Sequence, residues 1–135
     1  MPKREYQIDG HLFSDLQGFF DQISVHVIPG VQWGRNLDAF NDILRGGFGT
    51  PDEGFVLVWN NSAKSRKMLG YKETVTQLEG FLNRCHPENR DDVAKDLDQA
   101  KHNNGSTVFD WLVEIIEVHC RGGDEEDDGV ELRLA

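Results

Sequence analysis

The sequence predicts an α/β domain in which helices connect the strands of a small parallel sheet and cover both of its faces. Residues 55–59, Phe-Val-Leu-Val-Trp, form a continuous apolar run of β-branched and aromatic side chains. Such a run is typical of a strand that is buried on both faces, as in a parallel sheet. The patterns follow the order strand, two helices, strand, further helices, strand, which predicts helical crossovers but leaves the strand order open.

Two further segments alternate apolar and polar residues, and they are predicted to be the other two strands. The first, Glu5 to Asp9, places Tyr6 and Ile8 on one face, and Gly10 ends it. The second comprises residues 130–134, close to the end of the chain. Both are short enough to belong to a small sheet together with residues 55–59.

Helices are predicted where apolar residues recur every three or four positions. The first follows Ser14, which is suited to cap it, and runs through Val25. Its apolar stripe consists of Leu16, Phe19, Phe20 and Ile23. The later helices are predicted over residues 62–69 (capped by Asn60 or Asn61), 72–84, 87–101 and 109–119. Residues 121–129 are acidic and bounded by glycines, and we expect them to be a mobile loop.

The predicted helix Leu37–Arg45 has the clearest division into two sides. Asn36 is suited to cap its first turn, and Gly46 and Gly47 are suited to end it. At about 100° per residue, one side is apolar and the other is polar. The apolar side comprises Leu37, Phe40, Ile43 and Leu44, and the polar side comprises Asp38, Asn41, Asp42 and Arg45. The two carboxylates either face solvent, with Asp42 paired to Arg45, or face a partner.

The charge balance favours a protein partner over nucleic acid. The chain has 14 Lys and Arg against 24 Asp and Glu, so its formal net charge is −10. Binding to nucleic acid requires cationic side chains that replace counterions, so we expect no direct nucleic-acid ligand. A basic protein suits this field better, because electrostatic attraction would speed its association.

The 135-residue sequence is expected to form one domain, residues 1–135. No segment approaches the roughly 18 apolar residues of a membrane span, and the N-terminus lacks the apolar core of a signal peptide. We therefore expect no membrane association and a cytoplasmic location. Cys85 and Cys120 are too few for a disulfide framework and are expected to be free thiols.

Motifs that resemble metal or catalytic sites lack the required spacing. The cysteines lie directly beside His86 and His119, whereas structural zinc sites separate paired ligands by roughly two to four residues. The acidic loop lacks the glutamate that completes a calcium-binding loop. The histidines are scattered, and no set of nucleophile, base and orienting group is evident. We expect no metal, no cofactor and no enzymatic activity.

Several blocks of the sequence resemble one known family. Trp33-Gly-Arg-Asn-Leu-Asp-Ala-Phe-Asn-Asp-Ile-Leu44 is similar to the motif aromatic-Gly-x-Asn-Leu-Asp-Ala-Leu-x-Asp. The central strand of the family and the helix that follows it are similar to residues 55–59 together with Ser65-Arg66. Its first strand and first helix are similar to residues 6–16. Residues 109–134 fit its last helix and strand more loosely. The family is that of barstar, whose members are intracellular inhibitors of barnase-type ribonucleases, and residues 72–106 resemble an insertion relative to its short members.

The resemblance implies a barstar-like three-layer fold, with a three-stranded parallel sheet and helices on both faces. It also implies that an acidic helix and the loop before it plug a ribonuclease active site, where carboxylates replace RNA phosphates. By matching position, Asp42 is the main anchor and Asp38 its companion. The same surface would include Gln32, Trp33, Gly34, Asn36, Asn41, Arg45 and Gly46. The last helix of the family adds a carboxylate, for which Glu117 is the first choice and Glu114 the alternative.

The chain also departs from the family pattern. Gln32, Asn41 and Gly47 stand where the prototype has aromatic side chains, a residue class that often dominates interface energies. Arg35 and Arg45 add positive charge. We therefore expect the partner to be a basic extracellular-type or toxin ribonuclease other than barnase, with Arg45 contacting one of its acids. The alternative is a protein-binding module that keeps the fold and has a non-nuclease partner.

Overall fold

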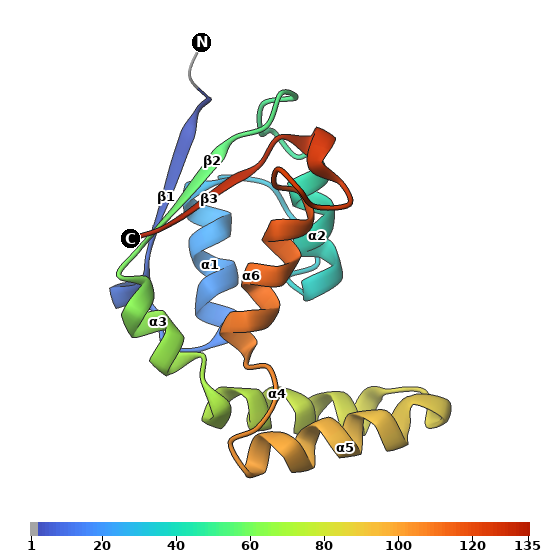
Figure 1. The fold of residues 1–135 in the computed structure, drawn as a ribbon. Coiled ribbons are helices and arrows are strands. Elements are labelled where there is room, and N and C mark those ends of the chain that lie inside the picture. Colours follow the sequence, from blue (N-terminus) through green and yellow to red (C-terminus); the bar gives the residue numbers. More distant parts are fainter. Residues whose placement is uncertain (1–2) are drawn as a thin grey trace.

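Three parallel strands form the sheet in the computed structural model, which describes residues 3–135 (Figure 1). They are β1 (Glu5–Asp9), β2 (Val56–Asn60) and β3 (Glu131–Leu134), and their order in the sheet is β1-β2-β3. Trp59 of the central strand pairs with Ile8 on one side and with Leu134 on the other. The predicted α/β class and the three-stranded parallel sheet are confirmed, with the apolar run at the centre.

The helices lie close to their predicted positions. They are α1 (Leu16–His26), α2 (Leu37–Arg45), α3 (Ser62–Met68), α4 (Tyr71–Arg84), α5 (Arg90–Lys101) and α6 (Val108–Val118). Short 3-10 turns are η1 (Gly10–Leu12), η2 (Pro87–Asn89) and η3 (Glu126–Asp128). Asp15, not Ser14, caps α1, since its carboxylate accepts from the N–H of Gly18 at 2.8 Å. Asn61 precedes α3, but its side chain donates to Asp9 instead of capping the helix.

The main helices cover one face of the sheet, so the prediction of helices on both faces is wrong. On β1, Tyr6 and Ile8 are buried in the core, whereas Glu5 and Gln7 are exposed. On the exposed face, Arg133 of β3 reaches Glu5 with a nitrogen–oxygen distance of 2.7 Å. Figure 1 shows α1, α2 and α6 together on the other side. Right-handed crossovers that advance in one direction, β1 to β2 to β3, place their helices on the same face, which gives two layers.

An aromatic cluster fills the space between the sheet and its helices. Trp59 of β2 is fully buried, and the rings of Phe19 and Phe109 lie 5.0 and 5.1 Å from it. Phe40 of α2 packs edge-on against Phe19 at 5.2 Å. The indole N–H of Trp59 donates to Ser65 Oγ at 3.0 Å, so its burial leaves no unpaired donor. The cluster therefore fixes α2 to the same core as the sheet.

The helices α4 and α5 form a hairpin that projects from the rest of the molecule (Figure 1). Leu78 and Leu97 lie at the centre of a small core within the hairpin, and Trp111 of α6 packs against this core. A carboxylate oxygen of Glu73 in α4 accepts from the backbone N–H of Leu16 at 2.7 Å. This acceptor at the first turn of α1 satisfies a free amide and fixes α4 against α1.

Replacing Asp15 by alanine is expected to lower the free energy of unfolding by about 1 kcal/mol, because α1 loses the acceptor at its first turn. Ser14→Ala, one position earlier, is the matched control and should change this free energy by less than about 0.5 kcal/mol. Urea denaturation followed by circular dichroism measures both variants. Equal losses, or a larger loss for Ser14→Ala, would contradict the assignment of Asp15 as the cap.

Candidate functional site

Helix α2 has one buried side and one exposed side, as predicted. The buried residues are Phe40, Ile43 and Leu44. Asp38 and Asp42 lie on the exposed side. Asn36 Oδ1 accepts from the N–H of Ala39 at 2.7 Å, and Gly46, with a φ of 104°, ends the helix. A well-capped short helix therefore presents both carboxylates to the surface.

The turn before α2 is fixed to α1. The indole N–H of Trp33 donates to Ser24 Oγ at 2.7 Å, and its ring packs edge-on against Phe20, with centroids 5.4 Å apart. Arg35 has a φ of 50° and forms an ion pair with Asp21. Trp33 and Arg35 thus hold the turn in place. The exposed residues beside them are Gln32 and Gly34.

Asp42 is bound within the chain instead of standing free. Nη1 of Arg45, one turn later, donates to Asp42 Oδ1 at 2.9 Å. The same guanidinium donates to both carboxylate oxygens of Glu125, at 2.8 and 3.2 Å. Hydrogen bonding between Arg45 and Glu125 lowers the pKa of Glu125 and raises the pKa of Arg45, so both are charged at neutral pH. Two acids share one cation, which leaves this surface net negative.

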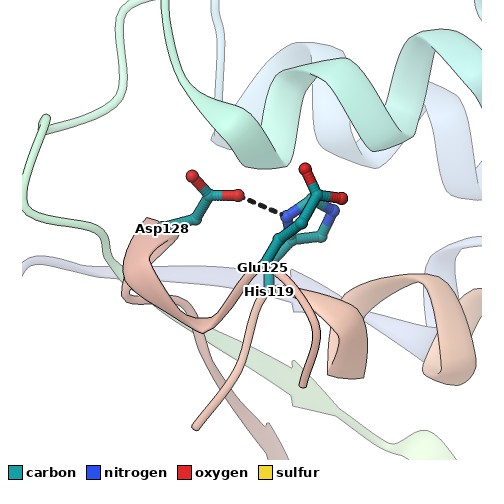
Figure 2. A group of neighbouring side chains, drawn as sticks. All are labelled: His119, Glu125 and Asp128. Carbon is teal, nitrogen blue, oxygen red and sulfur yellow. Dashed lines mark hydrogen bonds and ion pairs between the residues drawn. The ribbon is translucent and has the colours of Figure 1, made fainter. Parts of the chain in front are cut away.

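A buried histidine connects α2 to the loop after α6. The side chain of His119 has no solvent exposure, and its Nδ1 lies 2.6 Å from Asp128 Oδ2 (Figure 2). Its Nε2 lies 2.6 Å from Asn41 Oδ1. Buried polar groups destabilise a fold unless they are hydrogen-bonded, and here both ring nitrogens have a partner. One imidazole therefore joins residues of α2, α6 and η3.

These contacts correct two expectations. Residues 121–129 are not a free mobile loop, because Glu125 is bound by Arg45 and Asp128 is bound by His119. Asn41 is half-buried and turns its side-chain oxygen inward to His119, although it was expected to line the partner surface. The acidic loop and α2 consequently form one continuous surface.

His119, Glu125 and Asp128 each place a ligand atom within 4.8 Å of the others (Figure 2). Such donors suit a divalent cation. Here the Asp128 oxygen is hydrogen-bonded to His119, and the guanidinium of Arg45 already supplies a positive charge to Glu125. Burial raises the pKa of the neighbouring Cys120 thiol, which disfavours the thiolate that a metal requires. The expectation that no metal is bound stays a prediction.

A comparison with protein families identifies the family of this chain. The model of a family described as Barstar (barnase inhibitor) matches residues 4–92. The chain belongs to the barstar family. The match extends from β1 into the first turn of α5 and includes Asp38 and Asp42, while α6 and β3 lie beyond it. The comparison with curated proteins found no match.

The barstar family is one of inhibitors, not of catalysts. The expected lack of enzymatic activity in this chain stays a prediction. At the level of the family, its partner is a ribonuclease protein. Within residues 3–135, no helix is long and apolar enough to cross a membrane.

In this barstar-family chain, the acid from outside α2 that hydrogen-bonds to a residue of α2 lies in the acidic loop, and Glu117 or Glu114 of α6 stays a prediction for the partner surface. Glu117 is exposed beside Leu132 in a groove along β3, and Glu114 is exposed beside Trp111 near the hairpin. The contacting acid is Glu125, whose partner Arg45 lies 80 positions earlier. The acidic run was visible in the sequence, but spacing alone does not indicate that it folds back onto α2.

A cleft of about 440 Å³ opens beside the N-terminal end of α2. Its walls come from α1, α2 and α4. Asp38 lines it from α2, and Arg84 lines it from α4. The hairpin therefore reaches the surface that carries the barstar motif.

His119→Ala is expected to lower the free energy of unfolding by about 3 kcal/mol, because it leaves a cavity and removes the partner of Asn41 and Asp128. His11→Ala, at an exposed position, is the control and should be nearly neutral. Urea denaturation gives the free energies, and hydrogen exchange of residues 121–129 should accelerate in the His119 variant. Unchanged exchange would show that His119 does not hold the loop.

Proposed function

We propose that this chain is an intracellular protein inhibitor of a ribonuclease and that α2 plugs the active site of that enzyme. The observation that carries the proposal is the exposure of Asp38 and Asp42 on a rigid helix of a barstar-family chain. Their carboxylates would take the positions of RNA phosphates among the basic side chains of the enzyme. Trp33 and Phe40 support this role, because they fix the helix before any partner binds, and preorganised groups lose less entropy on binding.

The charge of the chain supports a basic partner. A net charge of −10 would attract a cationic ribonuclease over a distance of about one Debye length, roughly 8 Å at physiological salt. Locally, Asp38, Asp42 and Glu125 outnumber Arg45 on the surface of α2 and the acidic loop. The same charge argues against direct binding of RNA by the chain.

We further propose that the partner is a basic extracellular-type or toxin ribonuclease other than barnase. By the resemblance, Gln32, Asn41 and Gly47 stand where the family prototype has aromatic side chains, and aromatic anchors are a main source of interface energy. The bond from Asn41 to His119 adds to this argument, because a side chain turned inward offers no anchor. A different set of contacts implies a different enzyme surface.

In the proposed setting, the chain acts in the cytoplasm as an immunity protein or antitoxin and forms a single domain. One continuous core that extends from Tyr6 to Val130 supports the single domain. We propose that residues 72–106 are a helical insertion relative to the short members of the family. The separate small core of the α4–α5 hairpin supports this interpretation, whereas the family match includes residues 72–92.

A second candidate is a barstar-fold module with a non-nuclease partner. The position of Arg45 favours it, because this guanidinium neutralises part of the charge on Asp42 that a nuclease active site would bind. The two candidates differ in whether a ribonuclease is inhibited and in whether the two acids of α2 are needed.

For a cognate ribonuclease, Asp42→Ala is expected to weaken binding by about 2–5 kcal/mol, since one member of a buried charge pair is lost; the barnase–barstar complex itself contributes to this range. Asp91→Ala, at the exposed start of α5, removes the same charge and should change binding little. Inhibition of RNA cleavage by barnase, and by a ribonuclease encoded beside this chain, measures the effect. If the chain inhibits barnase tightly and Asp42→Ala does not weaken that inhibition, two proposals are refuted. These are that Asp42 anchors α2 in the active site and that the partner is a ribonuclease other than barnase.

Arg45→Gln is expected to speed association with a basic ribonuclease roughly two- to fivefold, because it removes the cation shared by Asp42 and Glu125. Glu125→Gln removes an acid from the same contact and should slow association instead. Stopped-flow measurements at low salt report both rates, and high salt should reduce both effects. This prediction replaces the sequence-based expectation that Arg45 contacts an acid of the partner, because Asp42 and Glu125 of its own chain already bind its guanidinium. Slower association of Arg45→Gln would support the sequence-based expectation instead.

A further inference from the structure

The cleft beside Asp38 has one wall made by the α4–α5 hairpin. We propose that this hairpin is part of the ribonuclease-binding surface and that Arg84 binds an acidic side chain next to the active site of the ribonuclease. The inference rests on the proposed inhibitor function and adds a contact outside the barstar motif of residues 33–44. The cleft is continuous with the N-terminal end of α2, because Asp38 and Arg84 both line it.

The cleft wall formed by α4 is fixed at the N-terminal end of this helix. Thr74 Oγ1 accepts from the buried backbone N–H of Val108 at 2.9 Å and donates to the carbonyl of Gly70 at 2.8 Å. The carboxylate of Glu73 accepts from the N–H of Leu16, which joins α4 to α1 on the opposite side of the cleft. A partner therefore meets a surface that is already formed, and little ordering is needed on binding.

Arg84 is held by stacking and not by an acid. Its guanidinium lies over the ring of Phe81, 5.3 Å from the centroid. Its Nη1 would lie 3.0 Å from a Cβ atom at Gly80. Glycine inside a helix costs about 1 kcal/mol relative to alanine, but here it leaves the space that the guanidinium occupies. Within the part of the chain that the structure describes, Arg84 forms no ion pair, whereas Arg35 forms one with Asp21 and Arg45 forms two, with Asp42 and Glu125.

Charge complementarity identifies the occupant as an acid. Arg84 stands at the edge of an acidic surface whose partner is basic, and juxtaposed like charges cost binding energy. A ribonuclease with only cations in this region would be repelled at Arg84, while one with a carboxylate there would be bound. Arg84 would therefore give the chain different affinities for related ribonucleases to which Asp38 and Asp42 alone would bind with equal affinity.

The hairpin also supplies aromatic surface. Phe81 lines the cleft and stacks on Trp111 with centroids 6.1 Å apart. Aromatic side chains in a fixed position bury area at low entropic cost. The cleft therefore compensates in part for the aromatic side chains that Gln32 and Asn41 replace.

The test uses the intact chain and a barnase-type ribonuclease that it inhibits in the titration described above. Arg84→Glu is expected to raise the dissociation rate about tenfold or more, because the acid of the enzyme then faces a like charge. Lys95→Glu makes the same charge change on the exposed surface of α5, outside the cleft, and should change dissociation less than about twofold. Exchange of the opposing enzyme acid for lysine should restore slow dissociation to Arg84→Glu.

Gly80→Ala gives an independent readout. Alanine should maintain or raise the melting temperature, since it favours the helix, but its methyl group displaces the guanidinium and should speed dissociation severalfold. Unchanged dissociation for Arg84→Glu and Gly80→Ala, with inhibition still abolished by Asp42→Ala, would overturn this inference and leave the proposed function standing. If Asp42→Ala also leaves inhibition unchanged, or if the chain binds no ribonuclease, the proposed inhibitor function and the inference about the hairpin are both overturned.

Discussion

The acidic surface depends on the buried imidazole of His119. Helix α2 and the loop after α6 both carry acidic side chains, which would repel each other unless hydrogen bonds held the two segments together. His119 provides these hydrogen bonds, because its two ring nitrogens bind Asn41 of α2 and Asp128 of the loop. Its carbonyl also accepts from the N–H of Val130, where the chain turns into β3. The same residue therefore fixes the end of α6, the start of the last strand and the position of Glu125 relative to α2.

Local patterns predicted most of the elements, because each depends on residues that are close in sequence. The apolar run at residues 55–59 supplies most of the central strand, Val56–Asn60, and the stripe from Leu16 to Ile23 is buried. The placement of helices on both faces was wrong, because the face follows from the strand order β1-β2-β3, and that order is set by pairing between distant segments. The partners of Arg45 could be predicted only in part. Asp42 lies one turn before it in the same helix, whereas Glu125 is brought to Arg45 by the path of the whole chain.

The departures from the barstar motif have a structural explanation at one position. By the resemblance seen in the sequence, Asn41 takes the position of an aromatic side chain of the family prototype, and in the structure its amide oxygen binds His119. A large aromatic side chain would lack this hydrogen bond, and the imidazole would lose one of its two partners. Asn41 thus offers no aromatic side chain to a partner, but through His119 it is connected to the loop that carries Glu125.

Attraction and selectivity arise from different charges in this chain. A net charge of −10 attracts any basic protein, so it speeds association but distinguishes partners poorly. Selectivity requires a feature that penalises the wrong partner. Cations set within or beside an acidic surface supply such a feature, because a partner without a matching acid is repelled there. Arg45 lies between two acids of its own chain and is largely satisfied, whereas Arg84 is stacked but unpaired among the described residues, so the penalty falls mainly at the hairpin.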